Sequence, residues 1–304
     1  SEQSLAQARE YLKNLQTAQA IQGLEDTLSY DLQNGEIVAT ITYANYWQEY
    51  IRHLAQLDSS FERGEALIVQ WKDFVSTYKD SPYEQSIDAL RHGVFQLALE
   101  NYQTLFQQGN QVQKSEILRK TGLCYKKLGD YEKALQFLNE ANSLVSDSAP
   151  VLAEMADCYA LCGDERIAKV LFREAFFVDA EKVDITLLES ELITSLISYV
   201  EKMKYSGAEL KEWIPVYGVL YGVFNIKREL RAVEAGKLKQ SVFALENELK
   251  EARGAEGILK PRLINHYFWL VDYYVNTNDD HARINEILLK IKLLDPSVHE
   301  KYVV

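Results

Sequence analysis

Apolar residues recur every three or four positions along most of the chain, which is the spacing of one face of an α-helix. The pattern predicts one helix or two over residues 3–30, and further helices over 37–57 and 60–79. Residues 37–43, "IVATITY", are rich in β-branched side chains, so a strand stays open as the alternative there. The pattern therefore predicts an all-α fold from the first residues onward.

The C-terminal region continues the same spacing and predicts long helices over 184–204, 209–226 and 230–253. The run "WIPVYGVLYGVFNI" is too short to span a bilayer, so we interpret it as a buried core helix. An exposed docking patch is the alternative, and its residues would be Trp213, Tyr217, Tyr221 and Phe224. The helix over 230–253 carries a short heptad seam, which either packs internally or pairs with a second copy as a homo-oligomer.

Residues 115–148 and 149–182 repeat one another without a gap at an offset of 34 residues. Gly129-Asp130 aligns with Gly163-Asp164, and the small residues Ala134 and Ala168 align after these turns. Glycine can end a helix in the left-handed conformation, and aspartate can cap the next helix through its side-chain oxygen. A fixed period of this length predicts paired helices that stack as a solenoid.

The stretch "GLCYKKLGDYEKALQFLNEA" resembles the tetratricopeptide repeat superfamily. The resemblance implies an all-α, helix-turn-helix α-solenoid that binds proteins without catalysing a reaction. Residues 81–114 resemble a degenerate unit with Gly93 at its turn, and 262–296 resemble a further unit or capping hairpin with Asn278-Asp279 at the turn.

Three regions follow from these patterns. Residues 1–80 form an N-terminal helical region, residues 81–182 hold the repeats, and residues 183–304 form a C-terminal helical region. Proline at position 82 is expected to begin a helix, because proline suits the first helical position.

The balance of 33 basic against 45 acidic residues gives a formal net charge of −12. Nucleic-acid binding needs concentrated positive charge, so we expect no nucleic-acid partner and no docking on an anionic membrane. No apolar run is long enough for a transmembrane segment. The chain lacks an initiating methionine, and we expect it to begin at a processing boundary.

The segment "FVSTYKDSPYEQSI" (74–87) is similar to a pattern in bacterial envelope members of the superfamily. We therefore expect a bacterial protein, and both the cytoplasm and the periplasm or envelope stay open as its compartment.

The three cysteines, Cys124, Cys158 and Cys162, are too few for a disulfide framework and are expected to be small buried thiols on first helices. Cys158 and Cys162 have the spacing of two metal ligands, but no histidine lies in the repeats, so no metal is expected. No phosphate loop, nucleophile elbow or zinc helix occurs, so we expect neither catalytic residues nor a cofactor.

The resemblance implies a concave groove lined by the first helix of each repeat. Its positions in this chain are Glu116, Arg119, Leu123, Lys126 and Lys127 in one repeat, and Ala153, Asp157, Ala160 and Leu161 in the next. These residue types differ from the Lys and Asn of family members that grip a C-terminal carboxylate, so no such clamp is expected. A protein scaffold is the first hypothesis; an assembly subunit docking through 209–253 and a small-molecule sensor are the alternatives.

Overall fold

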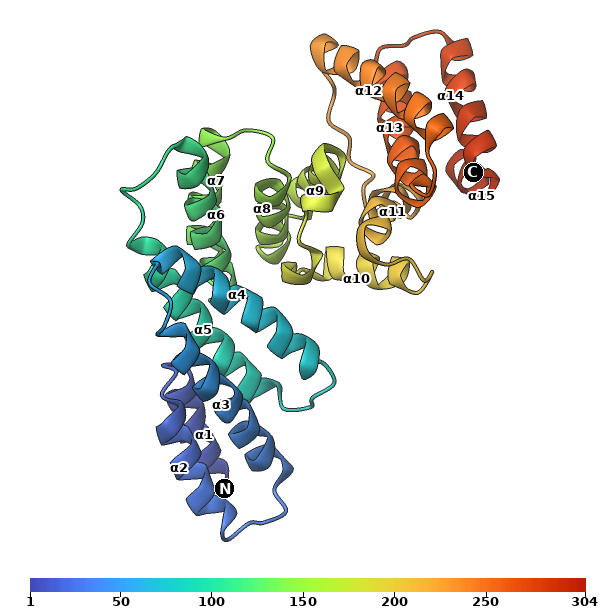
Figure 1. The fold of residues 1–304 in the computed structure, drawn as a ribbon. Coiled ribbons are helices and arrows are strands. Elements are labelled where there is room, and N and C mark those ends of the chain that lie inside the picture. Colours follow the sequence, from blue (N-terminus) through green and yellow to red (C-terminus); the bar gives the residue numbers. More distant parts are fainter. The chain divides into compact units, whose positions relative to one another are not determined.

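The computed structural model describes residues 1–304, which fold into two compact units, Ser1–Val145 and Ser146–Val304 (Figure 1). All regular secondary structure is helical, with fifteen α-helices and no strand. The predicted all-α class is confirmed, and successive helices pair as hairpins in the manner of a helical solenoid. The strand alternative for 37–43 is wrong, because this segment lies inside the third helix.

The first unit consists of seven helices that follow one another in chain order. They are α1 (Glu2–Leu12), α2 (Thr17–Leu28), α3 (Gly35–Leu54), α4 (Ser60–Thr77), α5 (Glu84–Gln103), α6 (Gln111–Lys127) and α7 (Tyr131–Leu144). Each helix packs on its neighbour in most of this series, and α1 also packs on α5 (Figure 1). Residues 3–30 therefore form two helices, and Pro82 lies two residues before α5 begins.

Aromatic side chains fill the interior between α3 and α4. Trp47 is fully buried, and its ring centroid lies 6.2 Å from that of Trp71 and 5.7 Å from that of Phe74. The ring of Phe95 in α5 packs edge-on against that of Trp71, with their centroids 5.7 Å apart, so α5 also contributes to this cluster. Tilted and edge-on pairs are the preferred aromatic geometries, so this cluster stabilises α3, α4 and α5 together.

Helix α5 runs without a break through Gly93, so the turn predicted at this residue is wrong. An added Cβ atom at Gly93 would lie 2.5 Å from the carbonyl oxygen of Leu12. The glycine therefore serves a close approach of α1 to α5 rather than a turn. The hairpin that precedes the predicted repeats consists of α4 and α5.

Both predicted repeat turns occur where the sequence places them. Gly129 has φ +83° and Gly163 has φ +87°, the left-handed conformation that ends α6 and α8 (Ala149–Leu161). Asp130 accepts a hydrogen bond from the backbone N–H of Lys133, and Asp164 caps α9 (Glu165–Asp179) in the same way. The boundary between the two units falls between these hairpins, so each unit holds one of them.

The predicted set of three buried thiols is only partly correct. Cys124 and Cys158 are fully buried, but Cys162 is exposed because it follows the last residue of α8. None of the three cysteines forms a disulfide bond, and no group of three or more His, Cys, Asp or Glu side chains could hold a metal ion.

The second unit contains eight α-helices and two short 3₁₀ turns. After α8 and α9 come the turns Ala180–Lys182 and Ile185–Leu187, then α10 (Glu191–Glu201), α11 (Gly207–Leu220), α12 (Ala232–Glu251), α13 (Glu256–Asn276), α14 (His281–Leu294) and α15 (Pro296–Val303). The helix predicted from residue 184 begins at Glu191, because the two turns precede it. The turn at Asn278-Asp279 is confirmed, and Asn278 has φ +49°. No helix has both the length and the apolar character needed to cross a membrane.

The heptad seam of α12 packs against α13 within the unit. Ala235, Leu238, Val242 and Leu245 are all buried in this contact region. Of the two uses left open for the seam, internal packing is the one that the structure shows.

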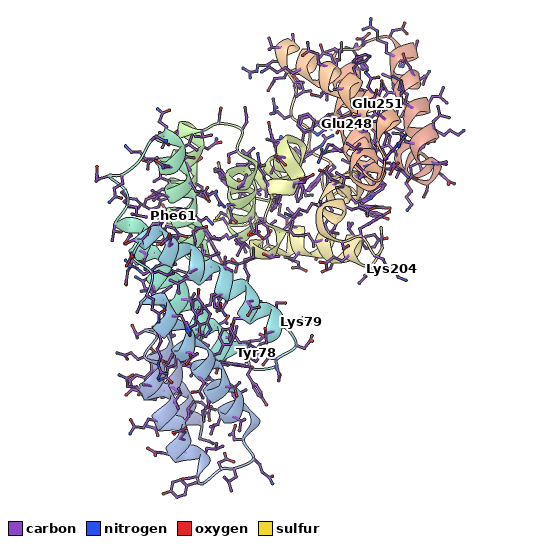
Figure 2. All side chains as sticks on the ribbon, in the orientation of Figure 1. Phe61, Tyr78, Lys79, Lys204, Glu248 and Glu251 are labelled. Carbon is purple, nitrogen blue, oxygen red and sulfur yellow. The ribbon has the colours of Figure 1, made fainter.

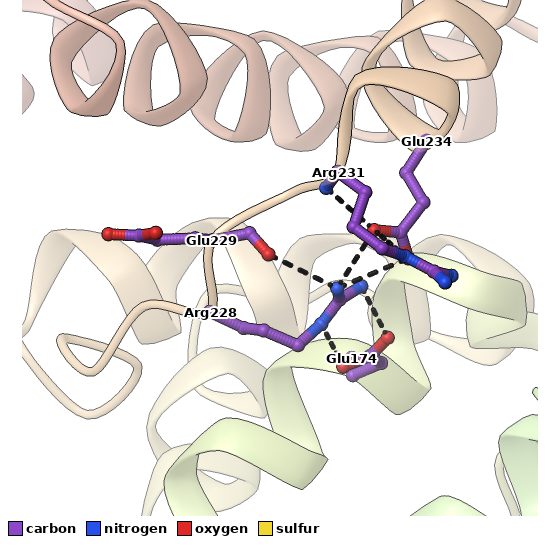
Figure 3. A network of polar contacts seen from close by, with 5 residues as sticks. All are labelled: Glu174, Arg228, Glu229, Arg231 and Glu234. Atoms are coloured by element: carbon purple, nitrogen blue, oxygen red, sulfur yellow. Dashed lines mark hydrogen bonds and ion pairs between the residues drawn. The ribbon is translucent and has the colours of Figure 1, made fainter.

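A polar network holds the segment between α11 and α12 against α9 (Figure 3). The guanidinium of Arg228 donates two hydrogen bonds to the carboxylate of Glu174, at 2.9 and 2.8 Å, and also bonds Glu234. The backbone N–H of Arg231, followed by the Arg231 and Arg228 side chains, lowers the pKa of Glu234 to about 2. Two charged helices are thereby joined through one arginine.

Candidate functional site

The predicted groove residues of α6 are mostly inaccessible. Leu123, Lys126 and Lys127 are 0%, 1% and 7% exposed, so their side chains do not line an open surface. Glu116 and Arg119 remain partly exposed and form an ion pair, with Arg119 donating at 2.6 Å to the Glu116 carboxylate. Burial of Glu116 is outweighed by Arg119 and Lys120, which together lower the pKa of its carboxyl group.

The predicted groove residues of α8 divide in the same way. Ala153 and Asp157 are buried, while Ala160 and Leu161 are partly exposed at the end of the helix. The Asp157 carboxylate accepts hydrogen bonds from the backbone N–H groups of Glu189 and Ser190, at 2.9 and 2.8 Å. This aspartate therefore helps to begin α10 in the second unit, a structural role that the repeat pattern did not indicate.

An apolar hollow of about 560 Å³ in the first unit borders the Glu116–Arg119 pair. Phe61 at the start of α4 (labelled in Figure 2), Leu105 after α5, and Val112 and Ile117 of α6 supply its apolar side chains. Val112 is 66% exposed and Phe61 is 37% exposed, so the hollow is open to solvent. Large apolar side chains gathered at an open hollow are typical of a surface that binds another protein.

The four aromatic residues of the predicted docking patch are largely interior. Trp213, Tyr217 and Phe224 are buried in the core of the second unit, and only Tyr221 is exposed. The Gly218 position explains the burial of Phe224, because an added Cβ atom would lie 2.4 Å from this ring. The buried-core interpretation of the apolar run is therefore confirmed, and these three residues do not form an exposed patch.

A cavity of about 440 Å³ lies in the second unit, bounded by the end of α9 and by α11, α12 and α13. Its polar lining consists of Asp179, Glu181, Glu212, Ser241, Glu248, Arg262, Asn265 and His266. Phe176, Phe177 and Leu245 are among its apolar walls. The volume is in the range of small-molecule sites.

Arg262 of α13 forms ion pairs with two carboxylates at the cavity wall. Its guanidinium donates to the Glu212 carboxylate at 3.0 and 2.7 Å, and to Glu181 at 2.7 Å. Burial raises the pKa of Glu212, which is 2% exposed, although Arg262 acts in the opposite direction. Burial by itself lowers the pKa of Arg262, but the two carboxylates raise it overall.

Asn265 lines the same cavity and is 2% exposed. Its Oδ1 atom is buried and has no hydrogen-bond partner in the protein. A buried polar atom left without a partner costs about 1–3 kcal/mol, and such atoms are uncommon in folded proteins. The amide of Asn265 therefore carries unused hydrogen-bonding capacity beside the cavity.

His266 is neutral at pH 7. Burial lowers its pKa to about 4, against the weaker opposing effect of a hydrogen bond with the backbone of Arg262. Nδ1 lies 2.8 Å from the Arg262 carbonyl oxygen, which can only accept, so Nδ1 carries the proton. Nε2 of the neutral ring is then an acceptor, and it has no partner within the protein.

Sequence reasoning did not find Arg262, Asn265 or His266. Arg262 directly precedes the largely apolar stretch "LINHYFWLV" of α13, and Asn265 and His266 lie within it. Polar residues at helical spacing on a buried helix were the available signal. The opposing residues Glu212 and Glu248 come from other helices, and nothing local connects them with α13.

No protein-family model matches the chain, and no curated protein matches its sequence. The fold and these sites define an all-α protein of helical hairpins, with an apolar hollow in its first unit and an acidic cavity in its second. The resemblance to tetratricopeptide repeats rests on the repeated residues alone and stays a prediction.

Proposed function

We propose that the protein is a non-catalytic scaffold of the tetratricopeptide type that binds a segment of a protein partner. The observation that carries the proposal is the open apolar hollow of the first unit, beside the predicted groove residue Glu116. The hollow would accept an apolar anchor side chain of the partner, and the ion pair at its edge would orient the flanking polar residues.

The hollow supports this proposal because it exposes apolar side chains on a backbone that is held in place by helix capping. Ile117 is 6% exposed and belongs to the wall, while Val112 projects from the first turn of α6. Asn110 and Gln113 cap α6 reciprocally at this end, so the backbone that carries Val112 is held in place. A pre-ordered surface loses little conformational entropy on binding.

The experiment is co-purification of partners from the native host with a tagged wild-type chain and two matched variants. Val112→Glu places a charge in the hollow, while Val69→Glu places one on α4 at a site of equal exposure, 64% against 66%. We expect Val112→Glu to lose a partner that wild type and Val69→Glu both retain. A partner set identical in all three samples contradicts the proposal.

An ion-pair exchange tests the polar edge of the same surface. The double variant Glu116→Arg with Arg119→Glu keeps the pair but inverts its direction on α6. The control exchanges the Glu10–Lys13 pair at the C-terminal end of α1, which is also three residues apart and exposed. We expect weaker capture only for the exchange on α6; equal capture by both exchanges assigns the edge no part in binding.

A further inference from the structure

The cavity of the second unit is acidic. Four of its lining side chains are carboxylates, those of Asp179, Glu181, Glu212 and Glu248, and one is a guanidinium, that of Arg262. Arg262 already forms ion pairs with Glu212 and Glu181, so its positive charge is compensated by two carboxylates. The electrostatic field of the cavity therefore favours a cation.

Two hydrogen-bond acceptors that line the cavity have no partner within the protein. Oδ1 of Asn265 has no partner, and Nε2 of His266 is an acceptor because the ring is neutral with its proton on Nδ1. Glu248, an exposed residue of α12 that is labelled in Figure 2, adds a carboxylate that forms no ion pair within the protein. A ligand that satisfies these acceptors must carry several N–H or O–H donors, and the acidic lining favours a cationic one.

We propose that this cavity binds an organic cation with N–H donors, namely a guanidinium or a primary ammonium group on a short chain. The charged head would donate to Asn265 and His266 and lie near Glu248, and the chain would contact the apolar walls at Phe177 and Leu245. No set of side chains suited to a metal ion is present, so the cation is organic rather than metallic. The inference goes beyond the proposed scaffold function and does not depend on it.

Binding is tested first with a matched pair of probes in isothermal titration calorimetry on the full chain. N-acetylarginine amide supplies the charged guanidinium, and N-acetylcitrulline amide has nearly the same shape without the charge. We expect saturable binding of the arginine probe and at least about tenfold weaker binding of the citrulline probe, because only the former gains from the carboxylates. Equal affinity for the two probes, or no saturable binding of the arginine probe or of agmatine, overturns the proposal.

The site is tested with a matched pair of variants on α12. Glu248→Gln removes the unpaired carboxylate of the cavity, and Glu251→Gln removes an exposed carboxylate three residues later that does not line it (Figure 2). We expect the dissociation constant of the arginine probe to rise roughly fivefold for Glu248→Gln and to stay unchanged for Glu251→Gln. Equal effects of the two variants would mean general charge attraction and overturn the site.

A third variant blocks the cavity itself. Ala244 lines the cavity but is exposed, so Ala244→Trp fills the space without disturbing the core. We expect this variant to abolish binding while its circular dichroism and thermal midpoint match those of the wild type. Retained affinity in a folded Ala244→Trp variant contradicts the assignment.

Two further probes distinguish a free small molecule from a protein side chain as the source of the cation. Agmatine represents a free amine metabolite, and acetyl-Gly-Arg-Gly amide represents an arginine side chain of a protein. Tighter binding of agmatine assigns the cavity to a small molecule, and tighter binding of the peptide assigns it to a basic side chain of a partner. Either order supports the cation site, because both probes share the guanidinium group.

Discussion

Arg173 donates a 2.5 Å hydrogen bond to Asp272 in the interior of the second unit, joining α9 to α13 across 99 positions of the chain. Both side chains are buried, at 2% and 6% exposure. Lys227 bonds the second oxygen of Asp272 at 2.5 Å, and the Arg173 guanidinium lies 4.7 Å from the Trp269 ring centroid. Helices α9 and α13, which both contribute to the cavity lining, are thus joined by a buried ion pair.

Removal of the acidic partner is expected to destabilise the second unit strongly. Asp272→Asn leaves the Arg173 charge buried without compensation, which costs about 3–5 kcal/mol of unfolding free energy. Chemical denaturation followed by circular dichroism measures the change. The control Glu300→Gln removes an exposed carboxylate of α15 and is expected to change stability by less than about 0.5 kcal/mol.

The same pair allows a rescue experiment. Arg173→Met combined with Asp272→Leu removes both charges and keeps an apolar volume, so we expect it to be more stable than Asp272→Asn alone. A double variant as unstable as the single one would mean that packing, rather than the unpaired charge, causes the loss.

Two glycines within helices predict opposite effects of the same substitution. Gly93→Ala places Cβ against the carbonyl oxygen of Leu12 and forces α1 away, so we expect a loss of about 1–3 kcal/mol. Gly23 lies inside α2 with nothing within 4 Å of an added Cβ, so Gly23→Ala is expected to stabilise the fold by about 0.5–1 kcal/mol. Thermal unfolding compares the two, and equal signs contradict the close packing of α1 on α5.

Two substitutions of Gly129, at the first repeat turn, are expected to lower stability to different extents. Its φ of +83° strains a side-chain-bearing residue, although nothing lies within 4 Å of an added Cβ. Gly129→Ala is expected to cost about 1–2 kcal/mol, and Gly129→Asn less, because asparagine tolerates the left-handed region. Denaturation midpoints in the order wild type, Asn, Ala support the strain; equal losses for both substitutions would indicate another cause.

His266 predicts a pH dependence of stability. Its pKa is about 4 in the folded protein against an ordinary value of 6.5, so the unfolded chain binds the proton more tightly. Stability is therefore lost as the pH falls from 6.5 toward 4, by roughly 2–3 kcal/mol from this group. Denaturation between pH 7 and 4 is expected to show a flatter curve for His266→Gln than for wild type, and parallel curves contradict the assignment.

The positions of helices and of several turns could be predicted from the sequence, because these depend on residues close together in the chain. The Gly-Asp pairs at 129–130 and 163–164 combine a left-handed residue with a helix cap, and both act within one turn of backbone. Helical spacing likewise identified the all-α class and the amphipathic faces of most helices. Local chemistry was sufficient for these features.

Tertiary structure decided which of those faces are accessible. Gly93 resembles a turn residue in sequence, yet it lies in a continuous helix because α1 passes against it. Lys126 occupies a position that the repeat assigns to a groove, yet it is 1% exposed. Burial depends on which helices pack together, and one segment does not carry that information.

The acidic cavity depends on tertiary structure most of all. Arg262 and Glu212 are 50 positions apart, and their hydrogen bond exists only because α11 and α13 pack together. The low pKa of His266 and the unpaired Oδ1 of Asn265 follow from the same packing, since burial removes the water that would otherwise solvate these groups. The sequence by itself determined the helices and their turns, and helix packing decided which polar groups meet without water.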